Sequence, residues 1–288
     1  MKDAQVYKAN ALVEASYRLS LYEQRVVLAC IAQVRRDEPL TDQKLYRISA
    51  QEIADMSGTQ IGTAYQNLKS ASERLFERRV TLHTAPNGGG KTKVLITRWV
   101  QTVEYDEGEG AVSLRFGTDM VPYLSQLTEQ FTRYALADIA KMTSAHAVRL
   151  YETLAQWRGA GERVVSIDWL RDAFQLENRY PNIRDFKRWV IEPAVAQINE
   201  HSPLWVQWDQ RKTGRRVSHL VFTFGDKTTK KPKASSKQKR PSKTENSLQG
   251  ALFGIPRAII EQNAKPGESY DDAALRLLNE SKRKRAST

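Results

Sequence analysis

The segment from Tyr180 to Phe224 constrains the fold of this chain more than any other. It reads YPNIRDFKRWVIEPAVAQINEHSPLWVQWDQRKTGRRVSHLVFTF. A proline-marked turn precedes a basic helical pattern, which is followed by a Trp-rich strand, a basic loop and a strand of alternating character. A recognition helix and its wing follow one another in this order. The segment therefore predicts a winged helix-turn-helix, which places a helix in the DNA major groove and a cationic loop on the backbone.

The same order of elements occurs earlier in the chain. Residues 10–35 carry an amphipathic helical pattern with Ser20 as a candidate N-cap, and Ser49 and Glu52 have the spacing of a capping box. A second helix is expected over 62–79. A hairpin then follows from VTLHT and VLITRWVQTVEY, with its wing at the Gly-rich turn, and GAVSLRFG adds a third strand. The predicted fold is α+β, with two tandem winged helix-turn-helix domains.

The composition changes from residue 226 onwards. The stretch KTTKKPKASSKQKRPSK contains eight basic residues and no acidic one, which predicts a disordered basic linker. The tail after it regains apolar periodicity and is expected to be partly helical. The predicted boundaries are 1–130 for a first winged helix that dimerises and contacts DNA, 131–226 for the main DNA-binding domain, and 227–288 for linker and tail.

The charge of the chain favours a phosphate-rich partner. The net charge is +12, of which residues 226–288 contribute +8, from 15 basic and 7 acidic residues. A basic protein without a nucleic-acid role is the alternative interpretation. The single cysteine, Cys30, excludes a disulfide framework and a cysteine metal site. Because no stretch resembles a leader or a membrane span, the chain is expected in the bacterial cytoplasm.

Several long blocks resemble one known family, the iteron-binding plasmid replication initiators. ANALVEASYRLSLYEQRVVLACIAQV is similar to the opening helix of that family, TSAHAVRLYETLAQW and DFKRWVIEPAVAQINEHSP to its second domain, and KTGRRVSHLVFTF to its wing. The resemblance covers roughly residues 5–225. It implies binding to direct repeats in a replication origin, monomers that open the origin, and dimers that repress their own gene. The tail is less typical of the family.

Within the helix predicted from Ile183 to Asn199, Phe186 and every fourth residue after it form an apolar stripe that should pack inward. Arg188 on the opposite face is the first candidate for a guanine contact, since its guanidinium group can donate two hydrogen bonds to O6 and N7 of the base. Pro193 is expected to kink the helix. The alternative is a solvated basic face. The predicted DNA-binding residues of this domain are Asn182, Arg184, Asp185, Lys187, Arg188, Trp189 and Glu192 on the helix, and Arg211, Lys212, Arg215 and Arg216 in the wing.

In the first domain, the predicted DNA-binding residues are Lys69, Arg74 and Arg78. These residues lie on the face of the second helix that is opposite its apolar side. Ion pairs with Glu73 or Glu77 are the alternative role for Arg78 and its neighbour Arg79.

No catalytic residue, metal or cofactor is predicted. Lys91-Thr92 ends a loose phosphate-loop pattern, but a strand follows it, whereas such a loop must open a helix. A rolling-circle nickase would need a tyrosine and a metal held by paired histidines, and the four histidines include no His-x-His pair. A winged-helix transcriptional repressor without an initiation role is harder to exclude, because it would contain the same winged helices. An array of direct repeats beside the gene would distinguish an initiator from that repressor.

A short motif in the tail resembles the peptide by which bacterial replication proteins hold the sliding clamp. Gln249, Leu252 and Phe253 supply its Gln-x-x-Leu-Phe pattern. Packing of the two apolar residues against the following helices is the alternative. The expected partners are double-stranded DNA with origin repeats, a second copy of the chain, and host replication proteins such as the clamp, helicase and initiator. No membrane partner is expected.

Overall fold

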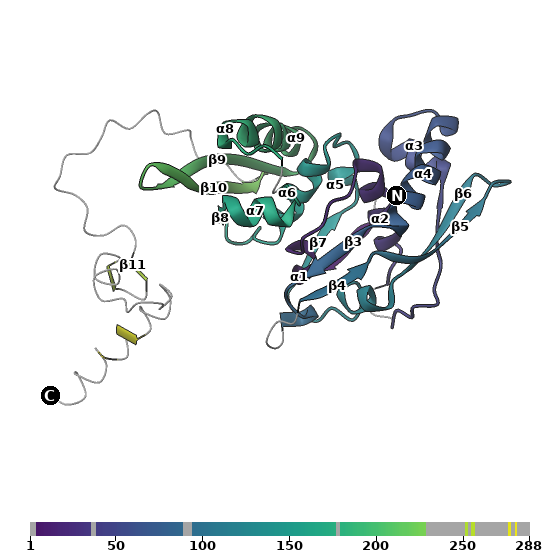
Figure 1. Ribbon diagram of the computed structural model, residues 1–288, viewed down its shortest axis with the longest axis horizontal. Helices are drawn as coiled ribbons and strands as arrows, with labels where there is room; N and C mark the ends of the chain where they lie inside the picture. Colours follow the sequence, from purple (N-terminus) through teal and green to yellow (C-terminus); the bar gives the residue numbers. More distant parts are fainter. Residues whose placement is uncertain are drawn as a thin grey trace. The chain divides into compact units, whose positions relative to one another are not determined.

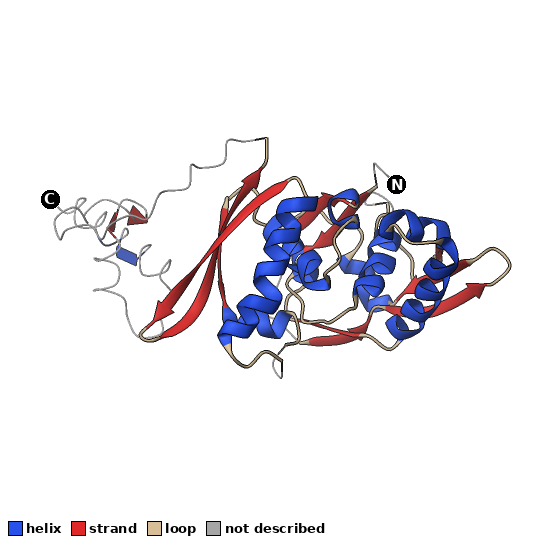
Figure 2. Cartoon of the chain, turned by 90° about the horizontal axis from the view of Figure 1, so that it is seen from above, coloured by secondary structure: helices blue, strands red, loops and turns tan. Residues whose placement is uncertain are grey.

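The computed structural model describes residues 4–35, 39–88, 94–176, 179–228 and a few short segments between 251 and 280. The chain divides into two compact units, Met1–Lys231 and Pro232–Thr288. In the part of the chain that the structure describes, no helix has the length and apolarity needed to cross a membrane. Figures 1 and 2 show the fold of the first unit.

The first half of this unit contains a winged helix built on α2, α3 and α4. Its three-stranded sheet has the order β2-β6-β5, and both pairings are antiparallel. The elements of this half are β1 (Gln5–Ala9), α1 (Asn10–Val13), α2 (Leu21–Ile31), β2 (Tyr46–Ser49), α3 (Ala50–Ser57), α4 (Ile61–Phe76), β3 (Arg79–Leu82), η1 (Pro86–Gly88), β4 (Leu95–Arg98), β5 (Val100–Asp106), β6 (Ala111–Phe116), η2 (Thr118–Tyr123), β7 (Phe131–Ala135) and α5 (Ala137–Ala140).

The second half repeats this topology. Its sheet has the order β8-β10-β9, so the strand before the second helix again pairs with the last strand of the hairpin. The elements are α6 (Ala145–Ala155), β8 (Glu162–Ser166), α7 (Ile167–Ala173), α8 (Ile183–Phe186), the π-helical turn η3 (Lys187–Ile191), α9 (Glu192–His201), β9 (Leu204–Thr213) and β10 (Arg216–Asp226). The prediction of two tandem winged helices is confirmed. The predicted linker lies almost entirely outside the described residues, as does most of the tail.

Local capping signals place several helix starts correctly. Ser49 caps α3 in a complete capping box with Glu52, as predicted, and Gly58 ends the helix with a left-handed φ of 68°. Ser20 likewise caps α2, again with a full box. The single helix expected over 10–35 is wrong, because the chain leaves α1 after Val13 and bridges to β3 before Ser20 starts α2.

The first wing lies elsewhere than the sequence suggests. The expected long hairpin is divided at Trp99, which is fully buried. Strands β3 and β4 form a separate two-stranded sheet, whereas β5 and β6 form the hairpin of the winged helix. The wing is therefore the turn over 107–110, and the predicted wing at the earlier Gly-rich turn is wrong. In Figure 1 the β5–β6 hairpin extends beyond α3 and α4.

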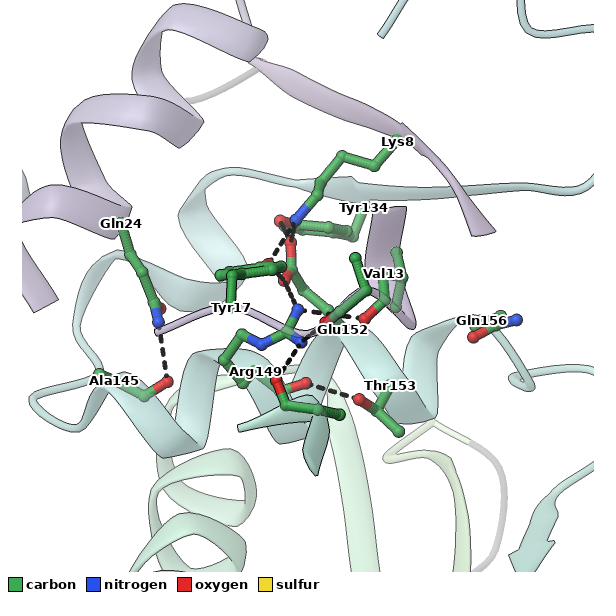
Figure 3. A network of polar contacts seen from close by, with 12 residues as sticks. Lys8, Val13, Tyr17, Gln24, Tyr134, Ala145, Arg149, Glu152, Thr153 and Gln156 are labelled. Carbon is green, nitrogen blue, oxygen red and sulfur yellow. Dashed lines mark hydrogen bonds and ion pairs between the residues drawn. The ribbon is translucent and has the colours of Figure 1, made fainter. Parts of the chain in front are cut away.

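A two-stranded sheet of the first half lies beside a buried polar network that joins the two halves. Strand β1 pairs with β7, so the first strand of the chain lies against residues 131–135, just past the predicted boundary at 130. Around it lies the junction network, shown in Figure 3. We define this network as Lys8, Tyr17, Tyr134, Arg149 and Glu152, in which Lys8 and Glu152 are each only 1% exposed.

Glu152 is the centre of the junction network. Its carboxylate accepts hydrogen bonds from Lys8 Nζ at 2.8 Å and from the Tyr134 hydroxyl at 2.6 Å. Arg149 stacks on Tyr17 and donates to three backbone carbonyls, two from the start of the chain and one at the end of α7. Burial pushes the pKa of Glu152 upwards, but Lys8 and Arg149 outweigh it and hold that pKa below its ordinary value. The charges therefore connect β1 with α6 and α7.

Candidate nucleic-acid interface

The third helix of the second winged helix is formed by α8, η3 and α9. The predicted apolar stripe is confirmed, since its members are all at most 1% exposed: Phe186, Val190, Ala194 and Ile198. The Asn182 side chain caps the helix by accepting a 2.9 Å hydrogen bond from the backbone N–H of Arg184. This contact joins the cap to the backbone two residues ahead, in the first turn of the helix. The buried stripe fixes which face of the helix points outwards.

Pro193 lies at the start of α9, immediately after the π-helical turn. Proline has no N–H, and its ring collides with the carbonyl four residues earlier, which here belongs to Trp189. The helix accommodates this by widening into the π turn, so the local distortion precedes the proline. Turns of this kind recur at functional sites.

The outward face of this helix carries most of the predicted contact residues. Arg188 and Trp189 lie side by side in the π turn, with the guanidinium carbon 5.0 Å from the ring centroid. Trp189 is 56% exposed, which is unusual for so large an apolar side chain. Arg184 and Glu192 are also exposed, and Asp185 is half-buried. A cation and an aromatic ring held together outside the core can reach into a groove.

Lys187 connects the helix to the hairpin. Its Nζ donates a 2.9 Å hydrogen bond to the Gln210 side chain of β9. This contact fixes the helix relative to the wing strand, so Lys187 has a structural partner in addition to its predicted DNA contact.

The second wing is a two-residue turn at the end of a long hairpin. Gly214 adopts a left-handed φ of 62°, which the turn requires, and Thr213 pairs with Arg216 across it. The four predicted cations are all exposed: Arg211, Lys212, Arg215 and Arg216. None of the ion pairs among the described residues involves them. The hairpin extends away from α8 and α9 on the left of Figures 1 and 2, and its tip is available to phosphate oxygens.

Two of the predicted cations of the first domain bind one buried carboxylate. Arg74 Nε and Arg78 Nε each lie 2.9 Å from a different oxygen of Glu23, whose side chain is fully buried. Burial raises the pKa of Glu23, but the hydrogen bonds from Arg78, the Ser20 backbone and Arg74 outweigh it and lower this pKa overall. For Arg78, the sequence suggested an ion pair with Glu73 or Glu77 as the alternative to DNA contact. The partner is instead a residue of α2, whose only sequence signal was its place in the Ser20 capping box.

The third predicted cation of the first domain is paired with its wing. Lys69 Nζ lies 2.7 Å from Glu107, and it also lies 5.5 Å from the ring centroid of Tyr105. The hydrogen bond that Lys69 donates to Glu107, together with the charge of that carboxylate, raises the pKa of Lys69. Each of the three predicted cations of the first domain therefore has a carboxylate partner.

The remaining predicted sites are described only in part. Gln249 and Phe253 lie outside the described residues, and Leu252 belongs to the short strand β11 (Ala251–Leu252), which pairs with β12 (Ile255–Pro256). Lys91-Thr92 also lie outside them, but the strand expected after them is present as β4. Among the described residues, no group of three or more His, Cys, Asp or Glu side chains could hold a metal ion.

Comparisons with known proteins agree with this architecture. The profile of the family described as Initiator Replication protein, WH1, matches residues 5–155, and that of Initiator Rep protein, WH2, matches residues 166–224. An uncharacterized 27.6 kDa protein of Escherichia coli is 28% identical over 230 residues, covering 76% of this chain and 95% of the relative. A replication initiation protein of the same organism is 25% identical over 229 residues, covering 77% and 70%.

A solved structure shares the fold. The crystal structure of Pi initiator protein in complex with iteron DNA has a TM-score of 0.64 to this chain at 22% sequence identity. The match covers 78% of this chain and 98% of that one. The similarity supports the tandem arrangement independently of the family profiles.

Proposed function

Because the chain belongs to the family of initiator replication proteins, we propose that it is a plasmid replication initiator. It binds direct repeats (iterons) at the origin, promotes opening of the duplex and recruits the replisome. The observation that carries this proposal is the second winged helix, which exposes Arg188 and Trp189 on its helix and four cations in its wing. A relative named as a replication initiation protein, and a similar fold solved with iteron DNA, favour initiation over the repressor alternative.

In this proposal the second domain supplies most of the base readout. Its recognition helix enters the major groove, where Arg188 pairs with a guanine, while the wing positions the domain on phosphates. The first domain binds a second segment of the major groove, about one helical turn away on the same face of the DNA. That domain is the secondary contact, because its predicted cations already have carboxylate partners.

The proposed function is tested by replication of a plasmid that carries the origin repeats. Supplying the protein in trans should support replication of that plasmid, and scrambling the repeats should abolish it. A protein that binds the repeats and represses its promoter, but never supports replication, would favour the repressor alternative.

Replacing Arg188 by Ala is expected to weaken binding to the repeat by about 1–3 kcal/mol and to relax discrimination at one base pair. The reason is the loss of a bidentate contact to one base edge. Fluorescence anisotropy with a panel of single-base-pair variants of the repeat measures both effects. Arg179→Ala, which removes a cation just before the helix, is the matched control. An unchanged base preference in the Arg188 variant would contradict its assignment.

We also propose that the chain represses its own gene as a dimer formed through β4. This strand lies at the edge of a two-stranded sheet, and Ile96 on it is 61% exposed, as is Val94 just before it. An open edge with exposed apolar side chains favours pairing with a second copy. Ile96→Lys should therefore shift the protein to monomers in light scattering across concentrations. A wild-type chain that is monomeric throughout, yet represses fully, would contradict this proposal.

The remaining partners, all of them host replication proteins, are proposed from the sequence. The Gln249 motif is proposed to hold the sliding clamp, because a basic linker precedes it and a tethered peptide gains a high effective concentration on DNA. Helicase and host initiator are proposed as further partners in the bacterial cytoplasm. No catalytic step is assigned to the chain itself. Opening of the origin draws on the binding energy of several copies that bend the DNA.

A further inference from the structure

The two wings of this protein have opposite charge. In the second domain, four cations surround the turn between β9 and β10. In the first domain, the corresponding turn carries the acidic wing, which we define as Asp106, Glu107 and Glu109, all exposed. The two hairpins occupy the same place in the two sheets, β2-β6-β5 and β8-β10-β9. The difference therefore concerns side-chain charge and not topology.

The carboxylates of the acidic wing hold cations from the rest of the first domain. Glu107 binds Lys69 of α4, the helix that corresponds to the recognition helix of the second domain. Asp106 lies 3.3 Å from Arg47 of β2, and Glu109 binds the same guanidinium. Asp106 also accepts a hydrogen bond from the backbone N–H of Glu109, which fixes the turn. Two cations of this face are thus neutralised from within the domain.

An acidic turn is repelled by a duplex, which carries one negative charge per roughly 1.7 Å of its axis. Such a wing cannot make the phosphate contacts that a basic wing makes. The acidic wing also keeps Lys69 from contacting phosphate, because the Lys69 ammonium group is already paired with Glu107 at 2.7 Å. Lys69 remains 41% exposed in its side chain, so phosphate would reach it if Glu107 released it.

We propose that the acidic wing limits the sequence-independent affinity of the protein for DNA. Glu107 keeps Lys69 from phosphate contact and holds the first hairpin away from the backbone. The phosphate affinity then comes mainly from the second domain, and the first domain binds only where its helix fits the groove. This inference rests on the proposed function, since it concerns how the initiator distinguishes its repeats from other DNA.

The test is Glu107→Gln, measured by anisotropy with a duplex that lacks the repeat at several salt concentrations. One additional phosphate contact should tighten this binding by up to roughly tenfold at 0.1 M salt and steepen the slope of log K against log[salt] by about 0.9. Adding Lys69→Gln should return both values to those of the wild type. Glu129→Gln, which removes one exposed carboxylate outside the wing, controls for net charge and should change neither value.

Two results would overturn the inference. One is a Glu107→Gln protein with wild-type affinity and slope, and the other is a gain that persists after Lys69→Gln is added. Failure of the proposed function gives a separate signature, because the wild-type protein would then show no preference for the repeat over the control duplex. The same titrations record that preference, so the two failures are distinguished.

Discussion

Replacing Lys8 by Met is expected to lower the free energy of unfolding by about 3–5 kcal/mol at pH 7. Lys8 is the closest cation to Glu152, at 2.8 Å, whereas the nearest Arg149 nitrogen is 3.8 Å from that carboxylate. The substitution keeps the apolar stem but leaves a buried charge without its main partner, which is the costly way to break a buried ion pair. Urea unfolding followed by fluorescence measures the change.

A second variant separates the charge from the packing. Lys8→Met together with Glu152→Gln should recover most of the lost stability, since the amide carries no charge and still accepts the Tyr134 hydrogen bond. Lys141→Met, at an exposed lysine, is the matched control and should stay within about 0.5 kcal/mol of the wild type. A Lys8→Met protein within 1 kcal/mol of the wild type would show that the junction network adds little to stability.

Acid should weaken the junction network and also the ion pairs of Glu23 with Arg74 and Arg78. The pKa of Glu152 is lowered in the folded chain, and so is that of Glu23. A carboxyl whose folded pKa is depressed contributes stability above its unfolded pKa, and this stability is lost as the pH falls through the folded value. Both ion-pair groups therefore stabilise the fold at neutral pH and lose this contribution in acid.

The fold was largely predictable because its signals are local. The Ser49 capping box lies within four residues, and the stripe from Phe186 to Ile198 follows helical spacing. The first wing was misplaced because two successive turns are both rich in glycine. The structure distinguishes them by burying Trp99, which separates β4 from β5. No local pattern indicates that a tryptophan between two strands lies in the core.

The charge pairs were less predictable because their partners are distant in sequence. Glu23 binds Arg74 and Arg78, 51 and 55 residues later, and Lys8 binds Glu152 across 144 residues. Helical spacing suggested neighbours on the same helix, whereas packing of α2 on α4 selected Glu23. The second wing was predictable in position and charge, since its turn and its four cations all lie within the short stretch Arg211–Arg216. Whether its cations contact DNA stays a prediction.

Replacing all four cations of the second wing by Gln is expected to reduce DNA affinity by roughly 10²–10³-fold at 0.15 M salt. Each phosphate contact adds about 0.9 to the slope of log K against log[salt], so the slope should fall by about 3–4. The loss should be the same for the repeat and for unrelated duplexes, because phosphate contacts carry no sequence information. Anisotropy titrations from low to physiological salt measure affinity and slope together.

Two double variants distinguish the effect of removing charges from the wing from the effect of lowering the net charge. Arg215→Gln with Arg216→Gln removes two charges from the wing, whereas Lys44→Gln with Lys141→Gln removes two exposed charges elsewhere. The wing pair should lower the slope by about 1.8, and the distant pair should leave it nearly unchanged, since charges more than about 10 Å from the DNA are screened at 0.1 M salt. Equal slopes for the two variants would mean that the wing faces solvent in the complex. The second domain would then bind through its helix alone.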